Sequence, residues 1–96
     1  MFKYKKTTIK FELTKFDYKY DEEVRDIVYA TINPGILQQY ITKFCVENKI
    51  DIISIKAENT WDYKFHVTVK TTRENINKLA YFLLDNFSKY IHNLQY

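Results

Sequence analysis

The chain is poor in residues that build tight loops and cross-links: its 96 residues include one glycine, one proline and one cysteine. A single glycine excludes the glycine-rich loops that hold phosphates in nucleotide-binding proteins. The lone Cys45 excludes an internal disulfide, and neither histidine has partners at metal-ligand spacing, so we expect no metal. No apolar run approaches the ~20 residues of a membrane-spanning helix, so we expect no membrane insertion.

The N-terminus and the cysteine content both indicate where the protein resides. No apolar stretch that could act as a signal peptide follows Met1. A lone cysteine within an apolar stripe is typical of a reducing compartment. We therefore expect a cytoplasmic protein.

Apolar and aromatic residues are abundant, at 46% and 18% of the chain. Such a chain buries a core, and at this length there is room for only one. We therefore expect a single domain over residues 1–96.

Hydrophobic periodicity predicts strands of period two and helices of period 3.6. Segment 24–32 is ambiguous, since its β-branched residues favour a strand whereas Asp21, Glu22 and Glu23 could open a helix. The strand is the preferred interpretation. In chain order we expect a strand over 7–16, a strand over 24–32, a helix from 34 to about 46, strands over 50–58 and 61–70, a helix ending near 87 and a strand over 89–96.

From residue 24 onward, this order is strand-helix-strand-strand-helix-strand. It predicts an α+β fold of the ferredoxin-like βαββαβ type, an antiparallel sheet with two helices on one face. Residues 24–96 then form the core, and residues 1–20 add an extra N-terminal strand. In strand 61–70 one face is predicted to be core and the opposite face solvated. The core face holds Trp61, Tyr63, Phe65, Val67 and Val69, and the solvated face holds Lys64, His66, Thr68 and Lys70.

Three segments carry a resemblance to a known family. The first segment is a helix that opens with Asn33-Pro34-Gly35-Ile36-Leu37. The second is a strand, Ile50-Asp51-Ile52-Ile53-Ser54-Ile55. The third covers residues 61–69 and leads into a helix from Arg73. This pattern resembles an ACT-like domain, most closely the cytosolic tail of MgtC-type membrane proteins. The resemblance implies a ferredoxin-like fold and a regulatory or interaction role, and it assigns no ligand residue to this chain.

No group of residues has the spacing of a catalytic site. His66 is expected on a solvated strand face, and Cys45 lies in a helical row of apolar residues that predicts burial. The carboxylates at 21–26 lack the glycine and spacing of a calcium loop. We therefore expect neither an enzyme nor a bound cofactor.

Charge is distributed unevenly along the chain. Residues 1–20 hold six lysines against Glu12 and Asp17, a net +4, whereas residues 21–26 hold four carboxylates against Arg25, a net −3. The basic end predicts either a lysine-protected edge strand or a surface for an acidic partner. Its candidate interaction residues are Lys3, Lys5, Lys6, Lys10 and Lys19.

A second candidate surface is apolar. Ile27, Tyr29, Ile50 and Ile52 are predicted on the sheet face opposite the helices, where a second copy of the chain would cover them. The expected function is therefore a small non-enzymatic regulatory or interaction module that binds a protein partner, or itself as a homodimer, through its sheet. The alternative is a phage- or plasmid-type protein that binds nucleic acid, or a nucleic-acid-processing complex, through its lysine-rich N-terminal strand.

Overall fold

The computed structural model describes residues 4–15, 18–29 and 32–96. Within these ranges neither helix has the length and apolar character needed to cross a bilayer. The elements are strands β1 (Lys5–Leu13), β2 (Tyr18–Asp21) and β3 (Asp26–Tyr29), helix α1 (Pro34–Glu47), strands β4 (Asp51–Asn59) and β5 (Tyr63–Thr71), helix α2 (Arg73–Phe87) and strand β6 (Ile91–Gln95).

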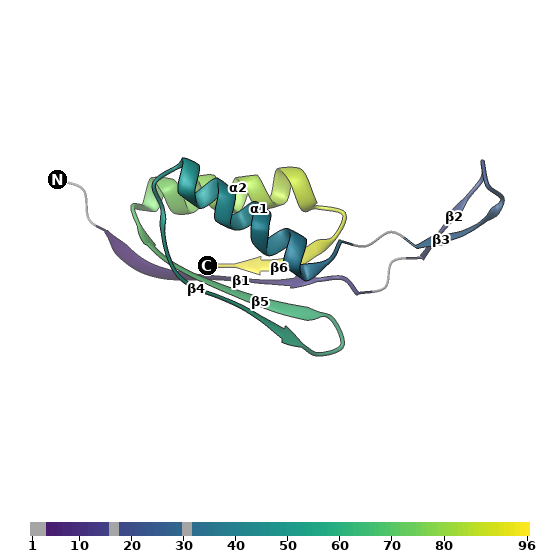
Figure 1. Cartoon of the computed structure of the whole chain (residues 1–96), viewed down its shortest axis with the longest axis horizontal. Helices are drawn as coiled ribbons and strands as arrows, with labels where there is room; N and C mark the ends of the chain where they lie inside the picture. The colour runs from purple at the N-terminus through teal and green to yellow at the C-terminus, as the bar shows by residue number, and fades with distance from the viewer. Residues whose placement is uncertain (1–3, 16–17, 30–31) are drawn as a thin grey trace.

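Four strands form one antiparallel sheet in the order β4-β5-β1-β6, and β2 pairs with β3 in a separate two-stranded sheet. Both helices cover one face of the larger sheet, and the β2–β3 hairpin stands away from this body at the far end of the molecule (Figure 1). The α+β class, with an antiparallel sheet and two helices, is therefore confirmed.

The first strand occupies a position that the sequence interpretation assigned to another segment. We expected residues 24–32 to supply the first core strand and residues 1–20 to add to it. Instead, β1 lies between β5 and β6, and the strand within 24–32 is β3, which pairs only with β2. The physical reason is apolar area: β1 is nine residues long and fully or almost fully buries Ile9, Phe11 and Leu13, whereas β3 has only four residues.

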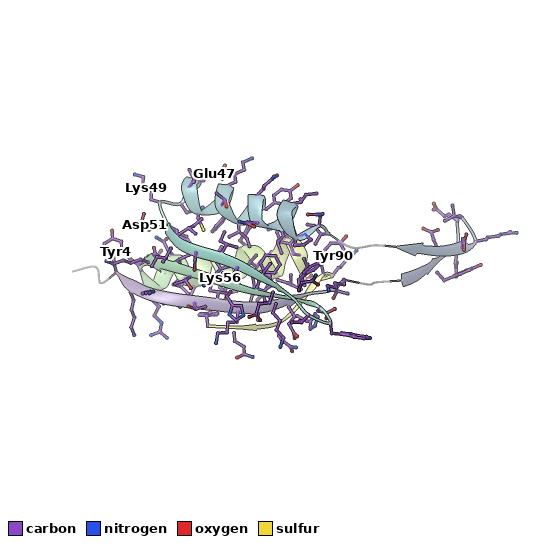
Figure 2. The ribbon with its side chains drawn as sticks, turned by 60° about the horizontal axis from the view of Figure 1, so that its bottom comes forward. Tyr4, Glu47, Lys49, Asp51, Lys56 and Tyr90 are labelled. Atoms are coloured by element: carbon purple, nitrogen blue, oxygen red, sulfur yellow. The ribbon has the colours of Figure 1, made fainter. Side chains whose placement is uncertain are left out.

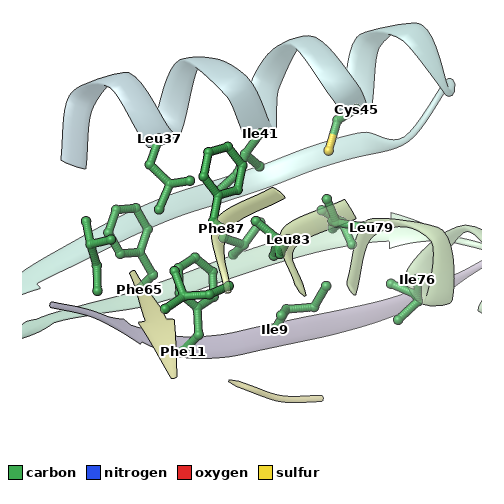
Figure 3. Close-up of a cluster of buried hydrophobic side chains, with 14 of the residues drawn as sticks. Ile9, Phe11, Leu37, Ile41, Cys45, Phe65, Ile76, Leu79, Leu83 and Phe87 are labelled. Atoms are coloured by element: carbon green, nitrogen blue, oxygen red, sulfur yellow. The ribbon is translucent and has the colours of Figure 1, made fainter. Parts of the chain in front are cut away.

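The core lies between the helices and the sheet. Leu37, Ile41 and Cys45 point from α1 toward the sheet, as predicted from their helical spacing, and α2 contributes Leu79 and Leu83 (Figure 3). From the sheet, Phe11 and Phe65 stack with ring centroids 5.0 Å apart. Phe65, Val67 and Val69 are fully buried, as predicted for the core face of β5.

Local chemistry sets where the helices begin. The Asn33 side chain accepts a hydrogen bond from the Gly35 amide at 2.7 Å, and Pro34 occupies the first helical position, which is the start predicted for this helix. Thr72 caps α2 by accepting from the Asn75 amide at 3.3 Å. Each cap satisfies an amide that the first helical turn leaves without a partner in the helix.

A β-bulge in β4 reverses the predicted faces of the residues that precede it. The register with β5 shifts between Ile52 and Ser54, so that Ile52 and Ile55 both pack against the core while Ile53 is 49% exposed. Ile50 is buried too. The predicted apolar patch on the open face is therefore wrong for Ile50 and Ile52, because the extra residue at the bulge interrupts the alternation of side chains. Residues before the bulge face the side opposite to the one that counting back from Ile55 predicts.

Trp61 is also misplaced by the sequence interpretation. The alternation of strand 61–70 placed it in the core, but β5 begins at Tyr63 and Trp61 lies in the turn after β4, where it is 90% exposed. Alternation applies only while the backbone stays extended, and the turn at residues 60–62 ends it.

Truncating the stacked ring at the centre of the core should destabilise the fold strongly. We expect Phe65→Ala to lower the free energy of unfolding by about 3–5 kcal/mol, the range for a buried aromatic side chain. Chemical denaturation followed by circular dichroism measures this loss. Trp61→Ala is the matched control, because an exposed aromatic ring changes stability by only about 0.5 kcal/mol or less. Similar losses for the two variants would contradict the assigned core.

Candidate functional site

The sheet face turned away from the helices is the candidate site, and we call it the open face. On β1 and β5, residues that alternate with the buried ones point to this face, and the register aligns them in rows across the strands. Basic side chains project from this face, and Lys56 of β4 is one of them (Figure 2).

In one row across β4, β5 and β1, every side chain is a lysine or an imidazole. Lys56 and Lys10 lie on either side of His66, each directly opposite it in the register, and we call these three residues the basic row. Lys10 and Lys56 are exposed and His66 is half-buried. Neither lysine forms an ion pair with a carboxylate of the described residues, whereas His66 Nε2 lies 3.8 Å from Glu58 Oε2. The row therefore presents two ammonium groups available to a ligand.

Short hydroxyl side chains form the next row. Ser54, Thr68 and Thr8 are aligned across β4, β5 and β1, and the hydroxyl oxygens of Thr8 and Thr68 lie 2.9 Å apart. Because these side chains are short, they leave a depression in the protein surface beside the longer side chains of the basic row. A hollow of about 390 Å³ lies there, lined by this hydroxyl row, the basic row and Glu58.

A second hollow, of about 310 Å³, lies on the other side of the basic row. Lys10 and His66 line both hollows. A ligand seated in either one would therefore contact these two side chains. The remaining side chains around the second hollow include Glu12, Lys64, Asn93 and Gln95.

Two further lysines lie directly opposite each other in the register, Lys6 on β1 and Lys70 on β5. Like charges at directly opposed positions destabilise a sheet. Asp51 lies opposite Lys70 on its other side. This end of the open face is therefore basic, with one carboxylate beside two ammonium groups.

The opposite end of the open face is a polar cross-link between three elements. His92 Nε2 lies 3.2 Å from Asp62 Oδ2 and 3.6 Å from Glu12 Oε2, and Asn93 donates to Glu12. These contacts join β6, β1 and the turn between β4 and β5. Over the described ranges no group of three or more His, Cys, Asp and Glu side chains could hold a metal ion.

The β1 lysines predicted to form one surface lie on two different sides of that strand. Lys6 and Lys10 lie on the open face, but Lys5 lies on the other side of β1, where it lines a separate hollow with Arg73 and Tyr96. Lys3 lies outside the described residues. The side chains of Lys19, Ile27 and Tyr29 also lie outside them, although the backbone places these residues in the hairpin.

The sequence interpretation missed Lys56, and it treated Lys64, His66 and Lys70 only as a solvated strand face. The alternation of β1 and β5 was visible in the sequence. What was lacking was their pairing, which aligns the polar sides of both strands on one surface.

Comparison of the chain with family models, with curated proteins and with solved structures found no match.

The thiol of Cys45 lies in the core, where it is fully buried. Burial disfavours the thiolate and raises the pKa of Cys45 from 9.0 to about 11. The thiol is therefore neutral at neutral pH and is no nucleophile there.

Thiol labelling tests this environment. Because the pKa is about two units above its ordinary value, the thiolate fraction at pH 8 should be about 100-fold lower than in the unfolded chain. We expect a soluble thiol reagent to modify Cys45 at least that much more slowly in buffer than in denaturant, with a short cysteine peptide as the control for the reagent. Comparable rates in the two conditions would show that Cys45 is accessible.

Proposed function

We propose that the protein is a non-enzymatic interaction module that binds an acidic segment of a protein partner on its open face. The observation that carries the proposal is the basic row, whose Lys10 and His66 line both hollows. A carboxylate lying in either hollow would meet an ammonium group, the imidazole and the hydroxyls or amides around them.

The distribution of lysines supports this proposal. Lys6 and Lys70 oppose each other across β1 and β5, an arrangement that destabilises the free protein. An anionic segment lying along the strands would remove that repulsion by placing negative charge between the two ammonium groups. Binding of this kind depends on exposed charges, so it should weaken as ionic strength rises.

The finer description of the fold belongs to the same proposal. We propose a ferredoxin-like βαββαβ arrangement made by β1, α1, β4, β5, α2 and β6, with the β2–β3 hairpin inserted after the first strand. The antiparallel order β4-β5-β1-β6 supports it. The ACT-like resemblance and the regulatory role that it implies stay predictions. A cytoplasmic location also stays a prediction, supported by the free, buried Cys45.

Nucleic acid is the second candidate ligand, because the same lysines could neutralise phosphates. Its support is weaker. Neither arginine lies on the open face, since Arg25 is in the hairpin turn and Arg73 begins α2. The strand residues described on that face include the imidazole of His66 but no Phe, Tyr or Trp ring on which a base could stack.

Titration of the protein with two probes tests the proposal and separates the ligands. One probe is a ten-residue polyglutamate peptide and the other is a ten-residue oligothymidylate. We expect the peptide to shift the amide NMR signals of Lys10, His66 and Lys56 at low salt. The double variant Lys10→Glu/Lys56→Glu should weaken its binding at least about tenfold, because two attractive contacts become repulsive.

The matched control is Lys43→Glu/Lys89→Glu, which makes the same change in net charge at exposed positions outside the open face. This control should retain most of the affinity of the wild type. Equal loss in both double variants would attribute binding to net charge alone and would contradict the proposed surface. Tighter binding of the oligonucleotide than of the peptide would favour the nucleic-acid alternative.

A further inference from the structure

The β2–β3 hairpin is an exposed arm whose two strands pair with each other in a sheet of their own. Each of its strands has four residues, and it stands apart from the sheet and helices (Figure 1). An isolated two-stranded hairpin is only marginally stable in water. A hairpin in this position therefore benefits from a surface against which to pack.

The end of the arm is acidic. The turn carries four carboxylates against Arg25, a net charge of −3 over residues 21–26. In the register of the hairpin, Asp21 and Asp26 lie directly opposite each other. The four carboxylates belong to Asp21, Glu22, Glu23 and Asp26.

The arm also has a defined shape and exposed apolar groups. Asp21 Oδ1 accepts from the Glu23 amide at 2.8 Å and from the Val24 amide at 3.3 Å, which holds the turn closed. Tyr20 and Val24 are 64% and 63% exposed. The arm therefore presents carboxylates and apolar side chains on one preformed turn.

We propose that the arm of one copy of this chain binds the open face of a second copy. This inference rests on the proposed function and names the acidic segment that the open face binds. Charge complementarity carries it: the strands of the open face hold five lysines against Asp51, Glu12 and Glu58, and residues 21–26 of the arm bring a net −3. A nucleic acid as the partner would leave the acidic arm facing phosphates of the same sign.

The dimensions agree with such a contact. β2 extends about 13 Å before the turn begins, at ~3.3 Å per residue, and the nine residues of β1 extend about 30 Å. The arm follows the end of β1 at which Glu12 lies, and Lys6 lies near the other end. In a two-fold pair that joins the two molecules at their arm ends, the acidic turn passes the partner's Glu12 and reaches its basic row, since Lys10 lies only two residues further along β1.

A two-fold pair uses this contact twice, because each chain carries both an arm and an open face. The dimer expected from the sequence is therefore retained, but on a different surface. It no longer depends on Ile52, which packs against the helices.

Reciprocal charge reversal tests this arrangement by sedimentation at micromolar concentration and low salt. We expect the wild type to approach twice the 11.7 kDa mass of one chain and to dissociate as salt rises. The arm variant Glu22→Lys/Glu23→Lys and the face variant Lys10→Glu/Lys56→Glu should each be monomeric. Asp21 is left unchanged because it closes the turn. Mixing the two variants should give a heterodimer with two attractive contacts, because the unchanged arm meets the unchanged face and the reversed arm meets the reversed face.

Two control variants change the net charge equally outside the proposed contact: Glu47→Lys/Asp85→Lys for the arm and Lys43→Glu/Lys89→Glu for the open face. Both should stay dimeric, and circular dichroism checks that each variant is folded. A folded arm variant that remains dimeric, or a mixture that stays monomeric, would overturn the inference.

The same experiment separates this inference from the proposed function. A monomeric wild type whose open face still binds polyglutamate would overturn the arm contact and leave the proposed function standing. A dimer that survives reversal of the arm alone and of the face alone, with no polyglutamate binding, would overturn both.

Discussion

The pairing of β1 with β5 is the interaction on which the rest of the structure depends. Nine residues of each strand are in register, and the stacked rings of Phe11 and Phe65 lie on the buried side of that ladder. β6 joins the sheet only through β1, and β4 joins it only through β5. Loss of this one ladder would therefore divide the sheet and remove the floor on which both helices pack.

The same ladder creates the open face. Because side chains alternate across a strand, the register that buries Ile9 opposite Val67 also sets Lys10 opposite His66 on the other side. The core and the candidate surface are thus two consequences of one alignment. A slip of one residue would exchange them, which is why the register is strongly specified in a sheet with one apolar side.

Uneven charge along the chain becomes a spatial separation of charge. The basic residues of β1 lie in the middle of the sheet, while the acidic residues that follow them occupy the turn of a hairpin that stands away from it. Each chain thus carries a basic open face and an acidic arm, so the arm of one copy is complementary in charge to the open face of another. This separation is what connects the proposed binding function to self-association.

Local features were determined by the sequence alone. Asn33 and Pro34 define the start of α1, and strict alternation marks β1 and β5, because caps and side-chain alternation depend only on neighbouring residues. Tertiary structure decided which strands pair, since partner choice depends on how much apolar area distant segments bury together. It placed β1 in the centre of the sheet, turned Ile52 inward at the bulge and brought Lys56 beside His66. The candidate surface could not be predicted from the sequence because it is made of residues from three strands, aligned only by their hydrogen-bonded register.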